Sequence, residues 1–263
     1  MSSFPPDSPL VDRVLPSPNH EARIGVAHPD ILLLHYTGMK STQAALERLC
    51  DPGPRVSSHY LVFEDGRILQ LVPEARRAYH AGAGSWEGTS DVNSRSIGIE
   101  IANPGHDHGY PAFPKRQVAA VTALCRSIVT RHRIAADRVL AHSDIAPSRK
   151  RDPGEKFPWK ALADSGVGLW VKPAPIAQGQ PVLTLGDRNP GIEDTQALLA
   201  NYGYGVTVSG YLDGATRDAI AAFQRHFRPQ GVDGNIDEST RATLKDLIAA
   251  RDAHPNASKR GSA

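Results

Sequence analysis

The chain has few cysteines, no long apolar run and almost no net charge, and each shortage excludes a class of protein. Its two cysteines, Cys50 and Cys125, lie far apart and form no Cys-x-x-Cys pair. This excludes a thiolate zinc site and argues against a disulfide framework, although one long-range disulfide stays open. The net charge of +2 comes without a basic block, so we expect no nucleic-acid partner. No run approaches the roughly 18 apolar residues of a membrane helix, so we expect no membrane span.

The first thirty residues also lack the features of a secretory leader. They are rich in Pro and Ser, and they contain neither an apolar core segment nor a lipobox-like cysteine. We therefore expect a cytoplasmic protein. A periplasmic or wall-associated location is the alternative, through a trimmed leader or another export route. The sequence carries no signal for the oligomeric state.

The composition that is present, 40% hydrophobic and 22% charged over 263 residues, is typical of a soluble globular protein with one large or two smaller domains. A change to Gly, Pro and Gln over residues 165–181 indicates a domain boundary. We predict an extended arm (1–24), a main domain (25–165), a linker (166–181), a small domain (182–252) and a flexible tail (253–263).

The main domain has the pattern of an α/β fold, a mixed β-sheet flanked by helices. Strands are predicted from apolar runs and alternation, and helices from apolar residues at helical spacing. The alternating strand places Ile97, Ile99 and Ile101 on one face and Gly98 and Glu100 on the other. The expected strands are 31–35, 59–63 and 68–72 with an Asp-Gly turn between them, 96–102 and 139–142, and the expected helices are 41–50, 114–133 and a short one near 157–162.

The small domain is predicted to be all-α, with helices at about 191–202, 214–228 and 238–251. It contains an internal repeat, because residues 208–216 and 232–240 both read Val-x-Gly-x-x-Asp-x-x-Thr. In each copy a glycine turn leads into an aspartate, Asp213 or Asp237, that can cap the following helix. This indicates a three-helix module.

Two residues near the end of the main domain have the side chains of metal ligands, and a lysine lies between them in the sequence. His142 ends an apolar strand, and a Pro- and Ser-containing loop then delivers Lys150 and Asp152. Zinc accepts an imidazole and a carboxylate, and a catalytic zinc site has three protein ligands and one open position. The alternative interpretation is a surface histidine beside a loop salt bridge, with Lys150 a solvated member of a basic run.

His35 is the preferred third ligand among the eleven histidines, because it also ends an apolar strand. Two strands that finish at the same sheet edge would present His35 and His142 together, where ligand sites of α/β proteins form. His106 and His108 are alternative ligands in a Gly/Pro loop. His59 and His80 are better read as packing or substrate-loop residues.

Glu100 is a carboxylate inside an isoleucine strand. A buried glutamate without a partner has a raised pKa, so one interpretation is a general base that takes a proton from metal-bound water. The other is a structural salt bridge, for example with Arg95. Lys150 beside a metal could stabilise an oxyanion.

Four ordered blocks within about residues 25–165 carry a resemblance to a known family. They are His35-Tyr-Thr, Ser57-Ser-His59-Tyr-Leu-Val, Asn93-x-Arg95-Ser-Ile-Gly-Ile-Glu100 and His142-Ser-Asp-Ile-Ala-Pro-x-Arg-Lys150-x-Asp152-Pro-Gly. These blocks resemble the zinc-dependent N-acetylmuramoyl-L-alanine amidases of the AmpD/AmiD type, which are related to peptidoglycan recognition proteins. Residues 182–250 resemble a three-helix peptidoglycan-binding domain, through Asp213-Gly-x-Thr216-x-x-Ala219-Ile-x-x-Phe223-Gln224 and Gly231-Val-Asp-Gly234.

The resemblance implies Zn²⁺ on His35, His142 and Asp152, with Glu100 and Lys150 as catalytic partners. It implies hydrolysis of the amide between N-acetylmuramic acid and L-alanine in peptidoglycan or muropeptides, with Glu100 moving the proton and Lys150 holding the oxyanion. A Gly-rich loop would help to bind substrate through four residues: His80, Trp86, Asn93 and Arg95.

One departure concerns a catalytic tyrosine that some relatives carry just before the hairpin histidine. This chain has Ser58 there, and we assign no such role to Tyr60. A non-catalytic peptidoglycan-recognition protein and a zinc hydrolase of another stem-peptide amide remain as alternatives. The sequence also leaves open whether the sugar is ordinary or 1,6-anhydro muramic acid, and whether the protein recycles muropeptides or remodels the wall.

Overall fold

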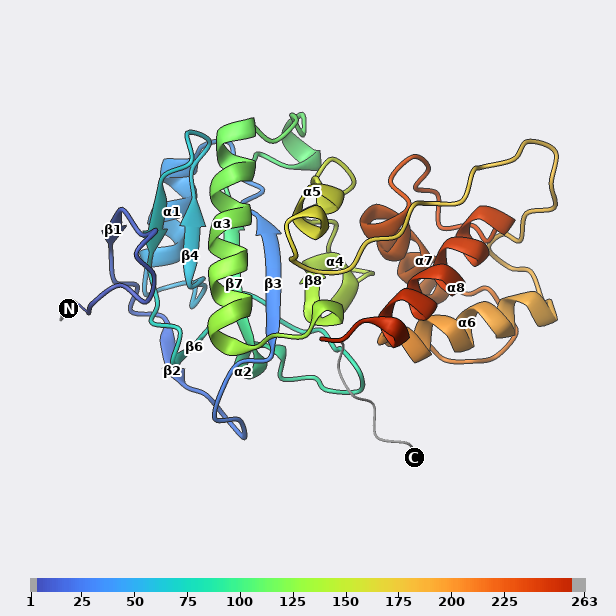
Figure 1. The fold of residues 1–263 in the computed structure, drawn as a ribbon, viewed down its shortest axis with the longest axis horizontal. Helices are drawn as coiled ribbons and strands as arrows, with labels where there is room; N and C mark the ends of the chain where they lie inside the picture. Colours follow the sequence, from blue (N-terminus) through green and yellow to red (C-terminus); the bar gives the residue numbers. More distant parts are fainter. Residues whose placement is uncertain (1–3, 257–263) are drawn as a thin grey trace.

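The computed structural model describes residues 4–256 and has an α/β body followed by a helical domain (Figure 1). The strands are β1 (Arg13–Val14), β2 (His20–Ala22), β3 (Ile31–Tyr36), β4 (Tyr60–Val62), β5 (Ile68–Gln70), β6 (Arg76–Ala78), β7 (Ser96–Ile101) and β8 (Val139–Ala141). The helices are α1 (Thr42–Cys50), α2 (Val92–Arg95), α3 (Lys115–His132), α4 (His142–Ile145), α5 (Trp159–Asp164), α6 (Pro190–Tyr202), α7 (Gly214–Phe227) and α8 (Glu238–Ala253). Both predicted fold classes are confirmed.

The main sheet has six strands in the order β1-β5-β4-β7-β3-β8. β3 lies between β7 and β8 and is parallel to both, while β4 and β5 form the predicted antiparallel hairpin. The apolar run from Ile31 to Leu34 is completely buried, as expected for a strand covered on both faces. This burial fixes the β3 register and therefore the place where His35 leaves the sheet.

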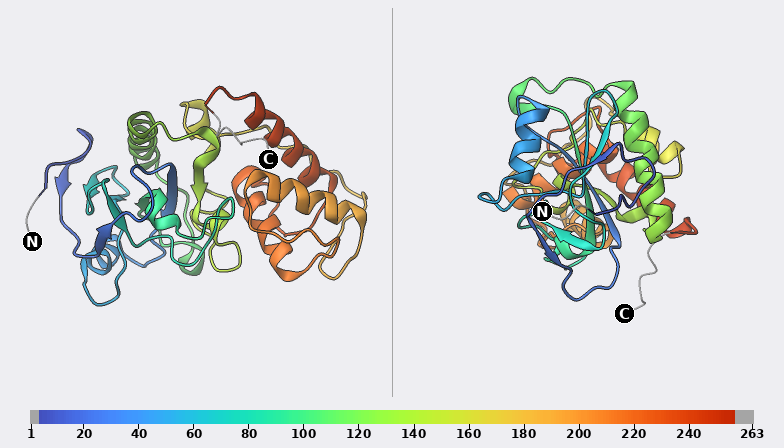
Figure 2. Two further views of the ribbon diagram at one scale, coloured as in Figure 1. Left: turned by 90° about the horizontal axis from the view of Figure 1, so that it is seen from below. Right: turned by 90° about the vertical axis from the view of Figure 1, so that its left-hand side faces the viewer.

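The two faces of the sheet are used differently. Ile97, Ile99 and Ile101 pack against α3 in one apolar cluster, as the alternation predicts. α1 covers the other side, and Figure 2 shows the two helices on opposite sides of the strands. Gly98 and Glu100 face the α1 side, so this side carries the polar groups. Cys50 in α1 and Cys125 in α3 are both free thiols.

The N-terminal segment, which we expected to be an extended arm, contributes a strand to each of the two sheets. β1 adds a parallel edge strand beside β5, and β2 pairs with β6. The Arg23 guanidinium donates hydrogen bonds to the carbonyls of Glu74, Ser94 and Ser96. These bonds hold the segment against α2, the start of β7 and the turn before β6. Most of the predicted tail, residues 253–263, lies outside the described residues.

The helical domain repeats one construction twice. Asp213 and Asp237 cap α7 and α8 by accepting hydrogen bonds from the backbone N–H of Thr216 and Thr240, as the sequence repeat predicts. A glutamine in the preceding helix binds each turn, because Gln196 accepts from the Ser209 and Gly210 N–H groups and Gln224 from those of Asp233 and Gly234. No helix within residues 4–256 has the length and apolarity to cross a membrane.

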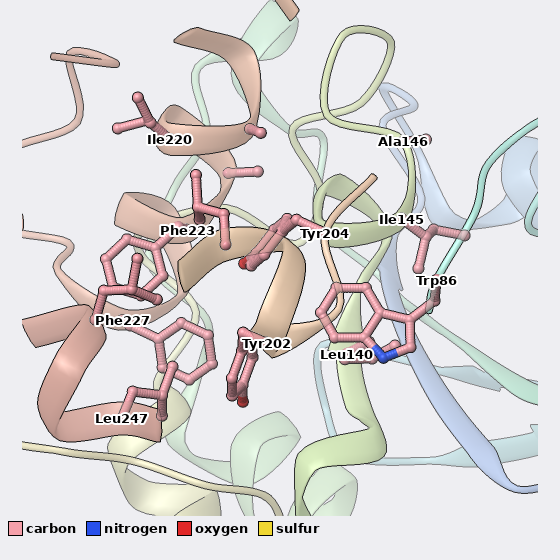
Figure 3. Close-up of a cluster of buried hydrophobic side chains, with 14 of the residues drawn as sticks. Trp86, Leu140, Ile145, Ala146, Tyr202, Tyr204, Ile220, Phe223, Phe227 and Leu247 are labelled. Atoms are coloured by element: carbon pink, nitrogen blue, oxygen red, sulfur yellow. The ribbon is translucent and has the colours of Figure 1, made fainter. Parts of the chain in front are cut away.

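A continuous apolar cluster joins the two domains (Figure 3). Trp86 projects from the Gly-rich loop of the α/β body, and its ring centroid lies 5.1 Å from that of Tyr204 and 5.9 Å from that of Tyr202. The Glu87 N–H donates to the Gly203 carbonyl at 2.9 Å beside this contact. Trp86 is only 1% exposed, so the helical domain docks on the α/β body by burying a large aromatic surface.

Candidate active site

Three predicted ligands come together at the carboxyl edge of the central strands. β3 and β8 are parallel neighbours with Leu34 opposite Ala141, so His35 and His142 leave the sheet side by side. His142 begins α4, and the loop after α4 brings Asp152 back to it. The backbone carbonyl of Asp152 accepts the Ser143 N–H at 3.0 Å. The strand register and this loop contact together create the cluster.

The donor atoms of the cluster converge on one point. The Nδ1 atoms of His35 and His142 are 2.8 Å apart, and they lie 3.1 and 2.9 Å from the Asp152 Oδ2. All three side chains are buried, and no other group of this kind occurs within residues 4–256. Donors bound at about 2.0–2.1 Å to one tetrahedral zinc ion are about 3.3 Å apart, so this trio needs to open only slightly.

A relay of hydrogen bonds sets the protonation of His35. The Ser96 hydroxyl donates to the Val92 carbonyl at 2.7 Å, so its oxygen accepts the Nε2–H of His80 at 3.3 Å. The free Nδ1 of His80 then accepts the Nε2–H of His35 at 3.0 Å. Burial first, and His142 second, lower the pKa of His35 to about 4. The neutral ring therefore directs the lone pair of Nδ1 into the cluster.

His142 is oriented in the same way by a backbone acceptor. Its Nε2 lies 2.9 Å from the Ala81 carbonyl, which can only accept, so Nε2 carries the proton and Nδ1 is free in the neutral ring. Two lone pairs and a carboxylate oxygen thus face one another, an arrangement that a divalent cation stabilises. The residues fit a three-ligand metal site with an open position.

Glu100 lies beside this cluster on the same face of the sheet. It is in register with His35 across the parallel β3–β7 pair, and both residues line one pocket. Its Oε2 is buried and has no hydrogen-bond partner among the described residues. Burial, and then the Asp152 carboxylate, raise its pKa well above the ordinary value, while Lys150 opposes the shift. The salt-bridge alternative fails, because Arg95 instead binds Asp30, with its Nε 2.9 Å from Oδ1.

Lys150 lines the same pocket as the three ligands and Glu100. The neighbouring Arg149 also lines the pocket, and its Nε donates to the Ala83 carbonyl of the Gly-rich loop at 3.0 Å. The basic run therefore faces the site, and one of its members also holds the loop. Arg48 and Arg55 add positive charge to the pocket wall.

The four predicted substrate-binding residues have different surroundings. Asn93 lines the pocket and shapes the loop, because its Oδ1 accepts the N–H groups of His80 and Ala81. His80 supports His35 as described above. Trp86 is buried in the domain interface and Arg95 binds Asp30 at the other end of β7, so neither lines the pocket. Trp86 and Arg95, which we predicted as substrate contacts, therefore lie away from the pocket. The helical domain covers Trp86 and Asp30 holds Arg95, and the Gly-rich loop gave no sign of either partner.

The alternative metal ligands lie outside the cluster. His106 bonds the Tyr36 hydroxyl at 2.9 Å and the Glu155 carboxylate at 3.1 Å, while His108 is exposed. His59 is a buried packing residue whose Nδ1 accepts the Gly98 N–H at 3.0 Å. Tyr60 points to the α3 side and donates to Glu74, so it takes no part in the site.

Sequence reasoning missed the residues that orient the ligands. Gly98 was the one available signal for such a residue. A β-carbon at this position would lie only 2.6 Å from the His80 ring. A glycine two residues before Glu100 on the same face indicates that a side chain from another element occupies that space. The sequence could not show that this side chain belongs to His80.

Comparison with known proteins agrees with this geometry. Residues 25–155 match the N-acetylmuramoyl-L-alanine amidase family and residues 188–244 a peptidoglycan binding domain. The chain is 38% identical over 233 residues to the N-acetylmuramoyl-L-alanine amidase AmiD of Escherichia coli, which covers 83% of this chain and 82% of that protein. It is 34% identical over 165 residues to the 1,6-anhydro-N-acetylmuramyl-L-alanine amidase AmpD of Citrobacter freundii, which covers 56% of this chain and 86% of that one.

Two solved structures share the arrangement of both domains. AmiD of Escherichia coli in complex with the substrate anhydro-N-acetylmuramic acid-L-Ala-D-gamma-Glu-L-Lys superposes with a TM-score of 0.70 at 35% identity, covering 88% of this chain and 97% of that one. AmpDh3 of Pseudomonas aeruginosa in complex with anhydromuramic pentapeptide superposes with a TM-score of 0.70 at 28% identity. This match covers 89% of this chain and 97% of that one. With its ligand cluster, its pocket glutamate and its helical domain, the chain belongs to the N-acetylmuramoyl-L-alanine amidases.

Proposed function

We propose that this amidase holds Zn²⁺ on His35, His142 and Asp152 and hydrolyses the amide bond between N-acetylmuramic acid, or its 1,6-anhydro form, and L-alanine. One observation carries the proposal: the two Nδ1 lone pairs and the Asp152 oxygen converge within 3.1 Å beside a glutamate whose Oε2 has no partner among residues 4–256. Two nitrogens and one oxygen suit zinc better than magnesium or calcium, which prefer oxygen ligands.

When bound, zinc supplies a Lewis acid that lowers the pKa of a coordinated water and polarises the scissile carbonyl. The protein groups then handle the protons and the charge. The raised pKa of Glu100 suits a group that accepts a proton from water and later donates one, because both steps are easiest near the working pH. The same carboxylic acid protonates the leaving nitrogen of L-alanine.

Lys150 supplies positive charge on the wall that faces the reacting carbonyl. Its ammonium group is close enough to act on the pKa of both Glu100 and His35. A fixed cation at this position stabilises negative charge that develops on the carbonyl oxygen, and removal of one such donor typically costs about 10²–10³ in rate. Arg48 and Arg55 on the pocket wall suit the carboxylates of a stem peptide.

The helical domain supports action on peptidoglycan or its fragments. A wall-binding module raises the local concentration of substrate without taking part in the chemistry. The bound ligands of the two relatives are anhydromuramyl peptides. We therefore propose 1,6-anhydro muropeptides as the first substrates to test, with the ordinary sugar as the comparison.

Mass spectrometry of the products tests the proposal. The zinc-loaded protein is incubated with defined muropeptides carrying either sugar, beside a chelator control and Glu100→Gln. We expect a free stem peptide that begins at L-alanine, and we expect both controls to abolish its release. Intact substrate with zinc bound would show a recognition protein, and cleavage at another amide would overturn the assigned bond.

A further inference from the structure

The short helix α4 helps to place two of the three residues of the metal cluster. It spans only His142–Ile145, and all four residues are buried. Its first residue is a ligand, and the N–H of its second, Ser143, binds the carbonyl of Asp152, another ligand. A single turn has too few internal hydrogen bonds to hold itself in place. The position of two ligands therefore depends on what packs around α4.

Asp144 is the residue through which α4 is held. Its side chain is 0% exposed. The carboxylate accepts the Ala141 N–H at 2.8 Å, which fixes the start of the helix. It also accepts the Nδ1–H of His226 and the hydroxyl of Tyr204, each at 2.7 Å. Two of these three donors belong to the helical domain.

The two donors are themselves held firmly in the domain interface. The His226 ring stacks between Trp159 and Phe227, with centroid distances of 3.7 and 3.8 Å. Tyr204 contacts Trp86, as Figure 3 shows, and burial raises the pKa of its hydroxyl well above the ordinary value, so it stays a donor. A buried carboxylate that loses a donor is strongly destabilised, so Asp144 and α4 would move to recover one.

We propose that the helical domain positions the metal ligands: Tyr204 and His226, acting through Asp144, hold α4 and hence His142 and Asp152. Both are positioning residues, and the domain is then part of the active-site support as well as a wall-binding module. The proposal rests on the proposed function only for the identity of the metal.

Conservative variants of the full-length protein test the proposal. Tyr204→Phe and His226→Phe keep the aromatic packing and remove one donor each. Tyr211→Phe removes a hydroxyl from the same domain at a partly exposed site, where Tyr211 contacts Arg188, and serves as the matched control. For each protein we would measure zinc affinity by chelator competition, kcat and KM on a soluble muropeptide, sedimentation with cell walls, and amide hydrogen exchange of α4 without metal.

We expect Tyr204→Phe and His226→Phe each to weaken zinc binding about tenfold, the low end for outer partners of a metal site. kcat should fall with KM and wall binding unchanged, and exchange at residues 143–146 should accelerate. Tyr211→Phe should match the unmodified protein. Variants that lose thermal stability yet keep zinc affinity and α4 protection would reduce the network to a structural role and overturn the proposal.

The two proposals fail in different ways. An unmodified protein that binds no zinc would overturn the proposed function, and the exchange of α4 in the metal-free variants would still decide the positioning role. If one variant fails to fold, the other gives the same comparison, because each removes a different donor from Asp144.

Discussion

Replacing Gly98 with alanine tests whether His80 controls the metal site. The new β-carbon would lie 2.6 Å from the Cγ and Nδ1 of His80, whereas ordinary contacts are 3.4–4 Å. β7 is paired on both sides, by β3 and β4, so the backbone cannot yield easily. The His80 ring must therefore retreat by about 0.8 Å or more. Its Nδ1 would then lie near the limit for a hydrogen bond to His35, from which it is now 3.0 Å away.

The displacement has two expected effects. Overpacking of this kind costs about 1–3 kcal/mol of folding stability, which corresponds to a fall in Tm of several degrees for a chain of this size. Loss of the bond to His35 should weaken zinc binding about 10- to 100-fold, because partners of ligating histidines have effects of this size. Calorimetry and chelator competition measure the two quantities. Gly214→Ala is the matched control, since its β-carbon would meet nothing within 4 Å.

A double-mutant cycle decides whether the effect passes through His80. In a His80→Ala background, Gly98→Ala should leave zinc affinity unchanged, because the ring that it displaces is gone. If Gly98→Ala weakened zinc binding equally in both backgrounds, the argument that His80 orients His35 would be refuted.

Three further substitutions probe charge and packing. Because burial raises the folded-state pKa of Glu100, metal-free protein should lose stability as the pH rises from about 4.5 toward that pKa. The Tm of Glu100→Gln relative to the unmodified protein should therefore increase as the pH rises above about 5, and a difference that stays constant with pH would contradict this. Lys150→Met should lower kcat on the order of 10²-fold while chelator competition shows zinc still bound. Trp86→Ala should lower the free energy of unfolding by about 3–5 kcal/mol in calorimetry, because it removes a buried side chain from the domain interface. If Trp86 instead bound substrate, the substitution would raise KM.

The convergence of His35 and His142 could be predicted because it follows from strand patterns. His35 and His142 each follow an apolar run, and the carboxyl ends of parallel neighbours meet at one edge. Glu100 could be identified because a charged residue inside an isoleucine alternation has only one face available to it. The helices of the second domain were predictable for a similar reason, since Asp213 and Asp237 are caps that act within three residues.

The supporting residues could not be predicted, because their partners are distant in sequence and often belong to the backbone. The acceptor for His142 is the carbonyl of Ala81, 61 positions earlier, and any residue type supplies a carbonyl. Asp144 accepts from Tyr204 and His226, 60 and 82 positions later. Such pairs leave no periodic pattern, so only the folded chain reveals them.

The docking of the helical domain also changes how the Gly-rich loop is understood. The loop supplies Trp86 to the interface, the Ala81 carbonyl to His142 and His80 to His35, so one segment connects the second domain with two of the three proposed ligands. Asp144, which lies in the same short helix as His142, makes a second connection. A wall-binding module on a free tether would raise substrate concentration alone. Because this module instead contacts both supports of the ligand cluster, its removal should weaken metal binding as well as attachment to the wall.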